Sequence, residues 1–204
     1  MRGRIAQTAA RLMKTDGISD FALAKRKAAR QLGVPATRNL PDNSEVEEAL
    51  LGYQQLFAPD SHRAWIRHLR EQARQLMLLL APFKPYLSGQ VVSGSAGRYS
   101  TIDIHLFAES GKQVEIFLID RQIPYRSSGK RMYIGNEYRN ISVLEWDGND
   151  AEFNVLVFEL DDLRRAIRYS PEGHVLDRVN LAWLDSALQS DQDPLSHCAA
   201  SSAK

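Results

Sequence analysis

The stretch that decides the fold is Val92-Ser93-Gly94-Ser95-Ala96-Gly97-Arg98-Tyr99-Ser100-Thr101-Ile102-Asp103-Ile104-His105-Leu106. A β-type run over residues 87–93 leads into the glycine-rich turn at 94–97, and a second such run follows over 101–108. In the second run polar and apolar residues alternate, which places Thr101, Asp103 and His105 on one face of a strand. The pattern predicts two strands joined by a Gly-Ser turn.

This turn and strand predict a phosphate site. Glycine lets backbone N–H groups approach phosphate oxygens closely, so Gly94 and Ser95 are candidate phosphate-binding residues. A carboxylate on the next strand, Asp103, could then hold Mg²⁺ against the same phosphates. The alternative is that the Gly-Ser pair is only a turn between two strands.

Basic residues lie close to the predicted site in sequence. Arg98 is in the turn itself, and Lys130 and Arg131 open a later strand. Arg98 and Arg131 are therefore candidate phosphate ligands, although bases in loops are often only solvated. His105 shares the predicted face of Asp103 and is either a ligand or a polar group satisfied within the core.

The arrangement resembles the nucleotidyltransferase superfamily, which includes DNA polymerase β and the aminoglycoside-modifying nucleotidyltransferases. The resemblance covers about residues 85–160, in the order strand, turn, strand, helix, strands. Gly94 and Ser95 match the family's turn, and Asp103 matches the second acid of its Ser-Asp-x-Asp frame. The resemblance implies a mixed sheet, a nucleoside triphosphate as ligand and Mg²⁺ as cofactor in an active enzyme.

The family's carboxylate pattern is incomplete in this chain. Thr101 occupies the first acid position, and a shifted register replaces the second acid with His105 instead. The third acid is expected within residues 151–155, where Glu152 is the candidate and Asn154 fits equally well. Asp103 and Glu152 are thus the candidate catalytic residues and Mg²⁺ ligands. Because phosphoryl transfer on two metals relies on such carboxylates, catalysis is either weakened or lost.

Helical spacing of apolar residues dominates the first 80 residues. It predicts one helix closed by Gly17, a second ending at Gly33, a third over about 44–57 and a fourth over about 61–80. We therefore expect an N-terminal helical region over residues 1–84, an α+β domain over 85–188 and a flexible tail over 189–204.

The later part of the chain has the pattern of a small sheet. Strands are predicted over 131–134, 141–146 and about 152–160, joined by turns at 135–136 and 147–148 that favour antiparallel hairpins. Short helices are predicted over 110–121, 161–168 and 181–188. The expected fold class is α+β, with a helical region followed by a small mixed sheet and flanking helices.

The formal charge of +1 hides a strong segregation of charge along the chain. Residues 1–38 carry nine Lys or Arg and two acids, a balance of +7. The second helix places Arg26, Lys27 and Arg30 opposite its apolar stripe. A basic helix face attracts phosphate backbones, so these residues are candidate nucleic-acid ligands. The alternative function is therefore a nucleic-acid-binding or regulatory protein, and a solvated face or plain interaction module remains a third interpretation.

A second basic feature is a row on the fourth helix, formed by Arg63, Arg67, Arg70 and Arg74. The row could flank a cleft, bind RNA or pair with the acidic segment 42–48, and we favour the pairing because that segment contains no base.

The cysteine content and the length of the apolar runs indicate the cellular compartment. Cys198 is the single cysteine, which excludes an intramolecular disulfide and a cysteine-based zinc site. The longest apolar run, 76–82, is far shorter than the roughly 20 residues that span a bilayer. The start of the chain lacks a continuous apolar segment, so no secretory leader is predicted. We expect a cytoplasmic protein without a membrane partner, and the oligomeric state stays open.

Overall fold

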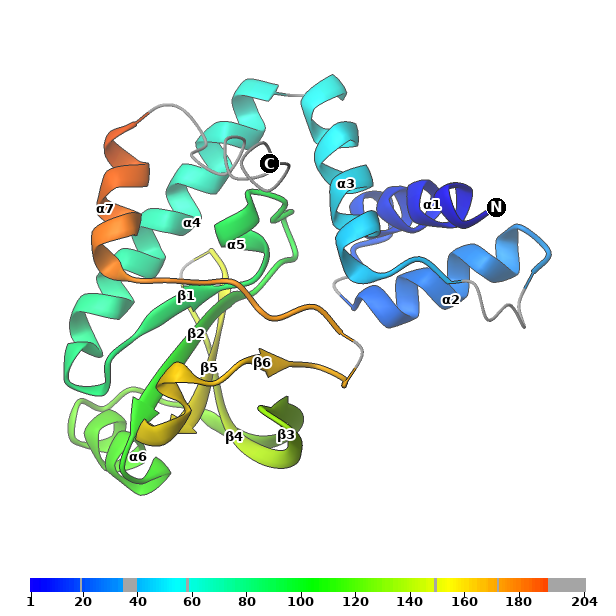
Figure 1. Ribbon diagram of the computed structural model, residues 1–204. Helices are drawn as coiled ribbons and strands as arrows, with labels where there is room; N and C mark the ends of the chain where they lie inside the picture. The colour runs from blue at the N-terminus through cyan, green and yellow to red at the C-terminus, as the bar shows by residue number, and fades with distance from the viewer. Residues whose placement is uncertain (19, 35–39, 58, 149, 172, 191–204) are drawn as a thin grey trace, which may run out of the picture. The chain divides into compact units, whose positions relative to one another are not determined.

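The computed structural model describes residues 1–18, 20–34, 40–57, 59–148, 150–171 and 173–190 (Figure 1). The chain divides into two compact units. The helical unit consists of residues 1–66 and 94–100, and the α+β unit consists of residues 67–93 and those from 101 on. The expected mixture of helices with a mixed sheet is confirmed.

Three helices lie entirely within the helical unit as far as the structure describes it, and all three were predicted. They are α1 (Arg2–Thr15), α2 (Phe21–Gln31) and α3 (Asn43–Phe57). The Asp20 side chain caps α2 by accepting hydrogen bonds from the N–H groups of Ala22 and Leu23. One apolar face of each helix enters a common core, whose buried members include Ile5, Ala9, Leu12, Ala24, Ala28 and Val46.

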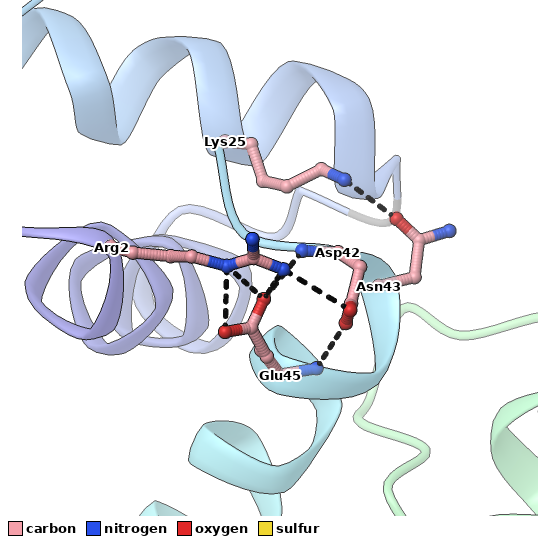
Figure 2. A network of polar contacts seen from close by, with 5 residues as sticks. All are labelled: Arg2, Lys25, Asp42, Asn43 and Glu45. Atoms are coloured by element: carbon pink, nitrogen blue, oxygen red, sulfur yellow. Dashed lines mark hydrogen bonds and ion pairs between the residues drawn. The ribbon is translucent and has the colours of Figure 1, made fainter. Parts of the chain in front are cut away.

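Figure 2 shows the polar contacts that join α1 and α2 to the start of α3. Arg2 Nε donates to the two carboxylate oxygens of Glu45 at 2.8 and 2.7 Å. The Glu45 N–H donates to Asp42 Oδ1 at 2.9 Å and the Asp42 N–H to Glu45 Oε2 at 2.8 Å, which is a capping box. Lys25 Nζ donates to Asn43 Oδ1 at 2.8 Å. These contacts use acidic residues of segment 42–48 within the helical unit.

Helix α4 (Pro59–Leu79) carries the predicted arginine row. Arg70 is buried and donates to the backbone carbonyls of Val91 and Val92 at 3.2 and 3.0 Å. Arg74 forms an ion pair with Asp185 on α7 (Leu181–Gln189), beside which α4 lies in Figure 1. For these two arginines, contacts within the α+β unit replace the predicted pairing with segment 42–48.

One mixed sheet forms the centre of the α+β unit. Its described strands are β1 (Tyr86–Ser88), β2 (Ile102–Ala108), β3 (Arg126–Ile134), β4 (Glu137–Asp147), β5 (Glu152–Glu159), β6 (Ile167–Arg168) and β7 (Arg178–Val179). Their order is β6-β3-β4-β5-β2-β1-β7. Strand β2 runs parallel to β5, and every other neighbouring pair is antiparallel. The predicted hairpins β3–β4 and β4–β5 are confirmed.

Two predicted elements differ from the structure. The run 87–93 is a strand only as far as Ser88, because Gly89 turns the chain with a φ of +73° and α5 (Gln90–Ser93) follows. The predicted helix over 161–168 is a 3₁₀ helix, η2 (Leu160–Arg164), followed by β6. The cap residue after η2, Arg165, is already extended, and this extended conformation leads into β6.

The two faces of the sheet bury different sets of side chains. Ile102, Ile104 and Leu106 of β2 are fully buried on one face, where α6 (Gly111–Asp120) contacts β2 and β5. The opposite face carries an apolar cluster that includes Phe107, Val143, Leu156, Phe158 and Ile167. By the alternation along a strand, Asp103 and His105 lie on this second face, next to the apolar cluster.

The units do not follow the predicted boundary at residue 84. The later part of α4 belongs to the α+β unit, whereas residues 94–100 belong to the helical unit. The short 3₁₀ helix η1 (Ala81–Phe83) ends α4 at the predicted place. Among the described helices, none is both long and apolar enough to cross a lipid bilayer.

Candidate functional site

The predicted phosphate turn is part of the helical unit. The Ser95 hydroxyl is fully buried and donates to Glu47 Oε1 at 2.7 Å. The carbonyl of Gly94 accepts from His62 Nε2 at 2.7 Å, and that of Gly97 from Trp65 Nε1 at 3.1 Å. These bonds hold the segment 94–97 against α3 and the start of α4. They account for its place outside the unit that contains Asp103.

Arg98, the third candidate in this segment, is exposed on the same loop of the helical unit. The next residue, Tyr99, contacts Gly17, where an added Cβ would lie 3.0 Å from the tyrosine ring. Gly94, Ser95 and Arg98 thus belong to the helical unit, whereas Asp103 belongs to the α+β unit.

The glycine that lies against Asp103 is Gly89. A Cβ built at Gly89 would stand 2.8 Å from Asp103 Oδ2, and the register pairs Ser88 with Asp103. No local pattern singled out this glycine, because the richer Gly-Ser segment follows it within a few residues.

Asp103 lies in a row of side chains that crosses the sheet. The register pairs it with Ser88 on β1 and with Asn154 on β5, and the row continues to Glu145 on β4. At the other edge, Ser88 pairs with Arg178 on β7. Directly paired residues point to the same face, so these side chains line one polar band beside the apolar cluster.

The Asp103 carboxyl group is held by neutral and cationic neighbours. Thr101 Oγ1 donates to Asp103 Oδ1 at 3.0 Å, and the Asn154 side-chain amide also hydrogen-bonds the carboxylate. Burial raises the pKa of Asp103, while the charge of Lys130 and these two hydrogen bonds act in the opposite direction. Asn154 thus occupies the position opposite Asp103 at which the resemblance implies a third acid.

Glu152, the other predicted acid, has a different partner. It accepts a hydrogen bond from Arg126 Nη2 at 2.9 Å, and its side chain is 43% exposed. Its register partner on β4 is Asp147, which also faces Arg126 at 3.9 Å. Although alternation gives Glu152 the same face as Asn154, the ion pair with Arg126 directs it to the β3 side of the sheet.

Of the two adjacent bases on β3, Lys130 faces the polar band. Its charge acts on both Asp103 and His105, and it pairs with Ile141 of the apolar face. Arg131, the predicted phosphate ligand, points to the opposite face, where its guanidinium lies 4.4 Å from the centre of the Tyr138 ring. Because successive side chains of a strand point to opposite faces, only one of these two adjacent bases can face the polar band.

His105 is a neutral core residue at physiological pH. Its side chain is almost fully buried, with the ring centre 4.9 Å from that of Phe158. Burial lowers the pKa of His105 to about 3, and the charges of Arg178 and Lys130 act in the same direction. Its environment therefore favours the uncharged imidazole.

The donor set around Asp103 does not fit the Mg²⁺ site that the resemblance implies. Mg²⁺ takes oxygen ligands, usually carboxylates, but Asp103 is bordered by a threonine, an asparagine amide and a lysine. Within the described parts of the chain, no group of three or more His, Cys, Asp or Glu side chains could hold a metal ion.

The predicted nucleic-acid ligands on α2 have unequal surroundings. Lys27 forms an ion pair with Asp16 at 2.6 Å. Arg26 and Arg30 are exposed, one helical turn apart, and in the described chain neither forms an ion pair or a side-chain hydrogen bond. The basic surface of α2 is thus reduced to these two arginines.

Comparison of the chain with protein-family models, curated proteins and solved structures gives no match.

Proposed function

We propose that the α+β unit is a nucleotide-binding module of the nucleotidyltransferase type that does not carry out metal-dependent nucleotidyl transfer. The observation that carries this proposal is the register of β2 with its neighbours. It puts Asp103 beside the Gly89 turn on one side and Asn154 on the other. The order β1, α5, β2, α6, β3 to β5 supports the same assignment, with the short helix α5 added between the first two strands.

The expected loss of nucleotidyl transfer follows from the side chains that form the polar band around Asp103. Phosphoryl transfer depends on metal ions that neutralise the charge developing on the phosphate oxygens, and carboxylates hold those ions. Here Thr101 and Asn154 stand at two of the three acid positions, and the remaining acid, Asp103, has a raised pKa. Since each 1.4 kcal/mol of lost transition-state stabilisation costs about tenfold in rate, such a site is expected to be inactive.

Binding of a nucleotide without turnover suits a regulatory protein, which we place in the cytoplasm on the strength of the sequence. The test combines calorimetry with the four nucleoside triphosphates and an assay of pyrophosphate release in Mg²⁺. We expect at least one triphosphate to bind. Pyrophosphate release should equal that of the matched Asp103→Asn variant, which keeps the size of the side chain and removes its charge. If the wild type releases pyrophosphate and Asp103→Asn abolishes that release, the protein is an active transferase. If no nucleotide binds at all, the proposal is refuted.

The second candidate function, binding of nucleic acid, rests on the two unpaired arginines of α2. Replacing Arg26 and Arg30 with glutamine is expected to weaken binding of duplex DNA and to reduce the salt slope by up to about 1.8, or about 0.9 per phosphate contact. The control is the double variant Lys84→Gln/Lys112→Gln, because both lysines are exposed in the α+β unit and the charge loss is equal. Filter binding between low and physiological salt measures both the affinity for DNA and its salt slope. If the wild type forms no complex with DNA at low salt, this second function is refuted.

A further inference from the structure

Three buried polar atoms of the α+β unit point to a missing partner. His105 Nδ1, Asn154 Oδ1 and Arg178 Nη1 are buried and, within the described chain, make no hydrogen bond. They come from β2, β5 and β7, which bring them to the same polar band as Asp103. Buried polar atoms in folded proteins nearly always have a partner, so three such atoms in one band indicate a ligand.

The cations beside these atoms, Lys130 and Arg178, form no close ion pair within the described residues. Arg178 Nη2 donates to the backbone carbonyls of Leu163 and Arg165 at 3.3 and 3.2 Å, while its guanidinium lies 5.2 Å from the centre of the Phe107 ring. Lys130 Nζ stands 4.8 Å from the centre of the Tyr169 ring. Neither cation forms an ion pair among the described residues. Burial lowers the pKa of Arg178, so its charge is partly withdrawn from water, and an anion bound at this place would offset that cost.

We propose that Lys130, Arg178 and His105 bind a phosphate group directly, without Mg²⁺. Arg178 Nη1 and Lys130 Nζ supply charged donors, which form the stronger class of hydrogen bonds to phosphate oxygens. The uncharged His105 supplies one more donor as its Nδ1–H tautomer. Thr101 and Asn154 make this possible, because the acids expected at their positions would repel a phosphate that no metal screens.

The free oxygen of Asn154 defines the ligand further. Because the Asn154 amide nitrogen is bound to Asp103, Oδ1 remains as an acceptor that needs a hydroxyl donor. A protonated oxygen of inorganic phosphate or a sugar hydroxyl of a nucleotide provides that donor, whereas sulfate at neutral pH does not. The inference rests on the proposed function for the location of the site and adds its chemistry: a metal-free site for a phosphate or a phosphate ester.

Calorimetry on the full chain tests the site with inorganic phosphate, sulfate, adenosine 5′-monophosphate and ATP, each in EDTA and in Mg²⁺. We expect phosphate to bind in EDTA, with less than a twofold change in Mg²⁺, and more tightly than sulfate. Lys130→Met should weaken phosphate binding by about tenfold or more, as the loss of a charge-assisted hydrogen bond implies. Arg131→Met, with the same charge loss on the opposite face of β3, should change it less than twofold.

A second measurement reports on the buried histidine itself. The NMR signals of the His105 imidazole should shift when phosphate is added to the wild type and to Arg131→Met, and should shift far less in Lys130→Met. Equal effects of the two methionine variants, phosphate binding that requires Mg²⁺, or unchanged His105 signals would each overturn the inference. If sulfate and phosphate bind equally well, the role of Asn154 Oδ1 as acceptor for a hydroxyl group of the ligand is refuted.

The same titrations separate this inference from the proposed function. If ATP binds but phosphate does not, and Lys130→Met has no effect, the phosphate site is refuted and the nucleotide-binding module stands. If phosphate binds as expected but no nucleotide does, the site stands and the proposed function falls.

Discussion

The double substitution Thr101→Asp/Asn154→Asp is expected to create a Mg²⁺ site in the α+β unit, where we expect no Mg²⁺ binding for the wild type. Both positions adjoin Asp103, the first through a 3.0 Å hydrogen bond and the second through the parallel register of β2 and β5. Three carboxylates at these positions supply the oxygen ligands that Mg²⁺ prefers. Calorimetric titration with MgCl₂ measures the gain.

Without metal, the same variant should be much less stable. Two carboxylates about 5 Å apart repel one another by about 3 kcal/mol at an effective dielectric constant near 20. For a chain of this size we expect a Tm lower by about 6–12 °C in EDTA, and recovery of most of that loss in Mg²⁺. The matched control Thr101→Asn adds no charge and should show no dependence on Mg²⁺. A double variant that binds no Mg²⁺, although it is folded, would contradict the assignment of these positions.

Gly89→Ala is expected to destabilise the α+β unit by about 2–3 kcal/mol, which corresponds to a Tm lower by about 5–10 °C. Part of the cost comes from the φ of +73°, which alanine adopts poorly. The rest comes from the new Cβ, which would lie 2.8 Å from Asp103 Oδ2. The carboxylate must then move away from its hydrogen bonds with Thr101 and Asn154. Thermal unfolding followed by circular dichroism measures the loss.

Two further variants separate these contributions. Gly111→Ala, in the first turn of α6, meets no neighbouring atom within 4 Å and should leave the Tm unchanged or slightly raised. When Asp103 is also changed to alanine, Gly89→Ala should cost only the backbone part, about 1–2 kcal/mol. An equal cost with and without Asp103 would show that the glycine and the carboxylate do not interact.

Local patterns predicted much of the secondary structure. The helical spacing of Ile5, Ala9 and Leu12 identified α1, and turn residues such as Gly135 marked the hairpins of β3, β4 and β5. The alternation around Asp103 placed it on the face of β2 opposite Ile102 and Ile104, which are fully buried while Asp103 is half-buried. These features depend on residues within one or two turns of each other, and such residues constrain their own backbone through sterics and periodicity.

The composition of the site, by contrast, depended on pairing between distant segments. Asn154 rather than Glu152 meets Asp103 because the parallel register of β2 with β5 sets them opposite, and because Arg126 binds Glu152. That register depends on cross-strand packing over about fifty residues of chain, which no local pattern encodes.

Local sequence patterns were enough to predict most of the helices, the hairpins and the face of β2 on which Asp103 lies. The fold was needed to show that Gly89 lies against that carboxylate, and that Lys130, not Arg131, lies on its face of the sheet. The physical reason is the same in both cases. The residues next to a glycine or a lysine in the sequence do not reveal which residues it contacts in the fold. Those contacts depend on the burial of apolar faces and on strand register across the whole unit.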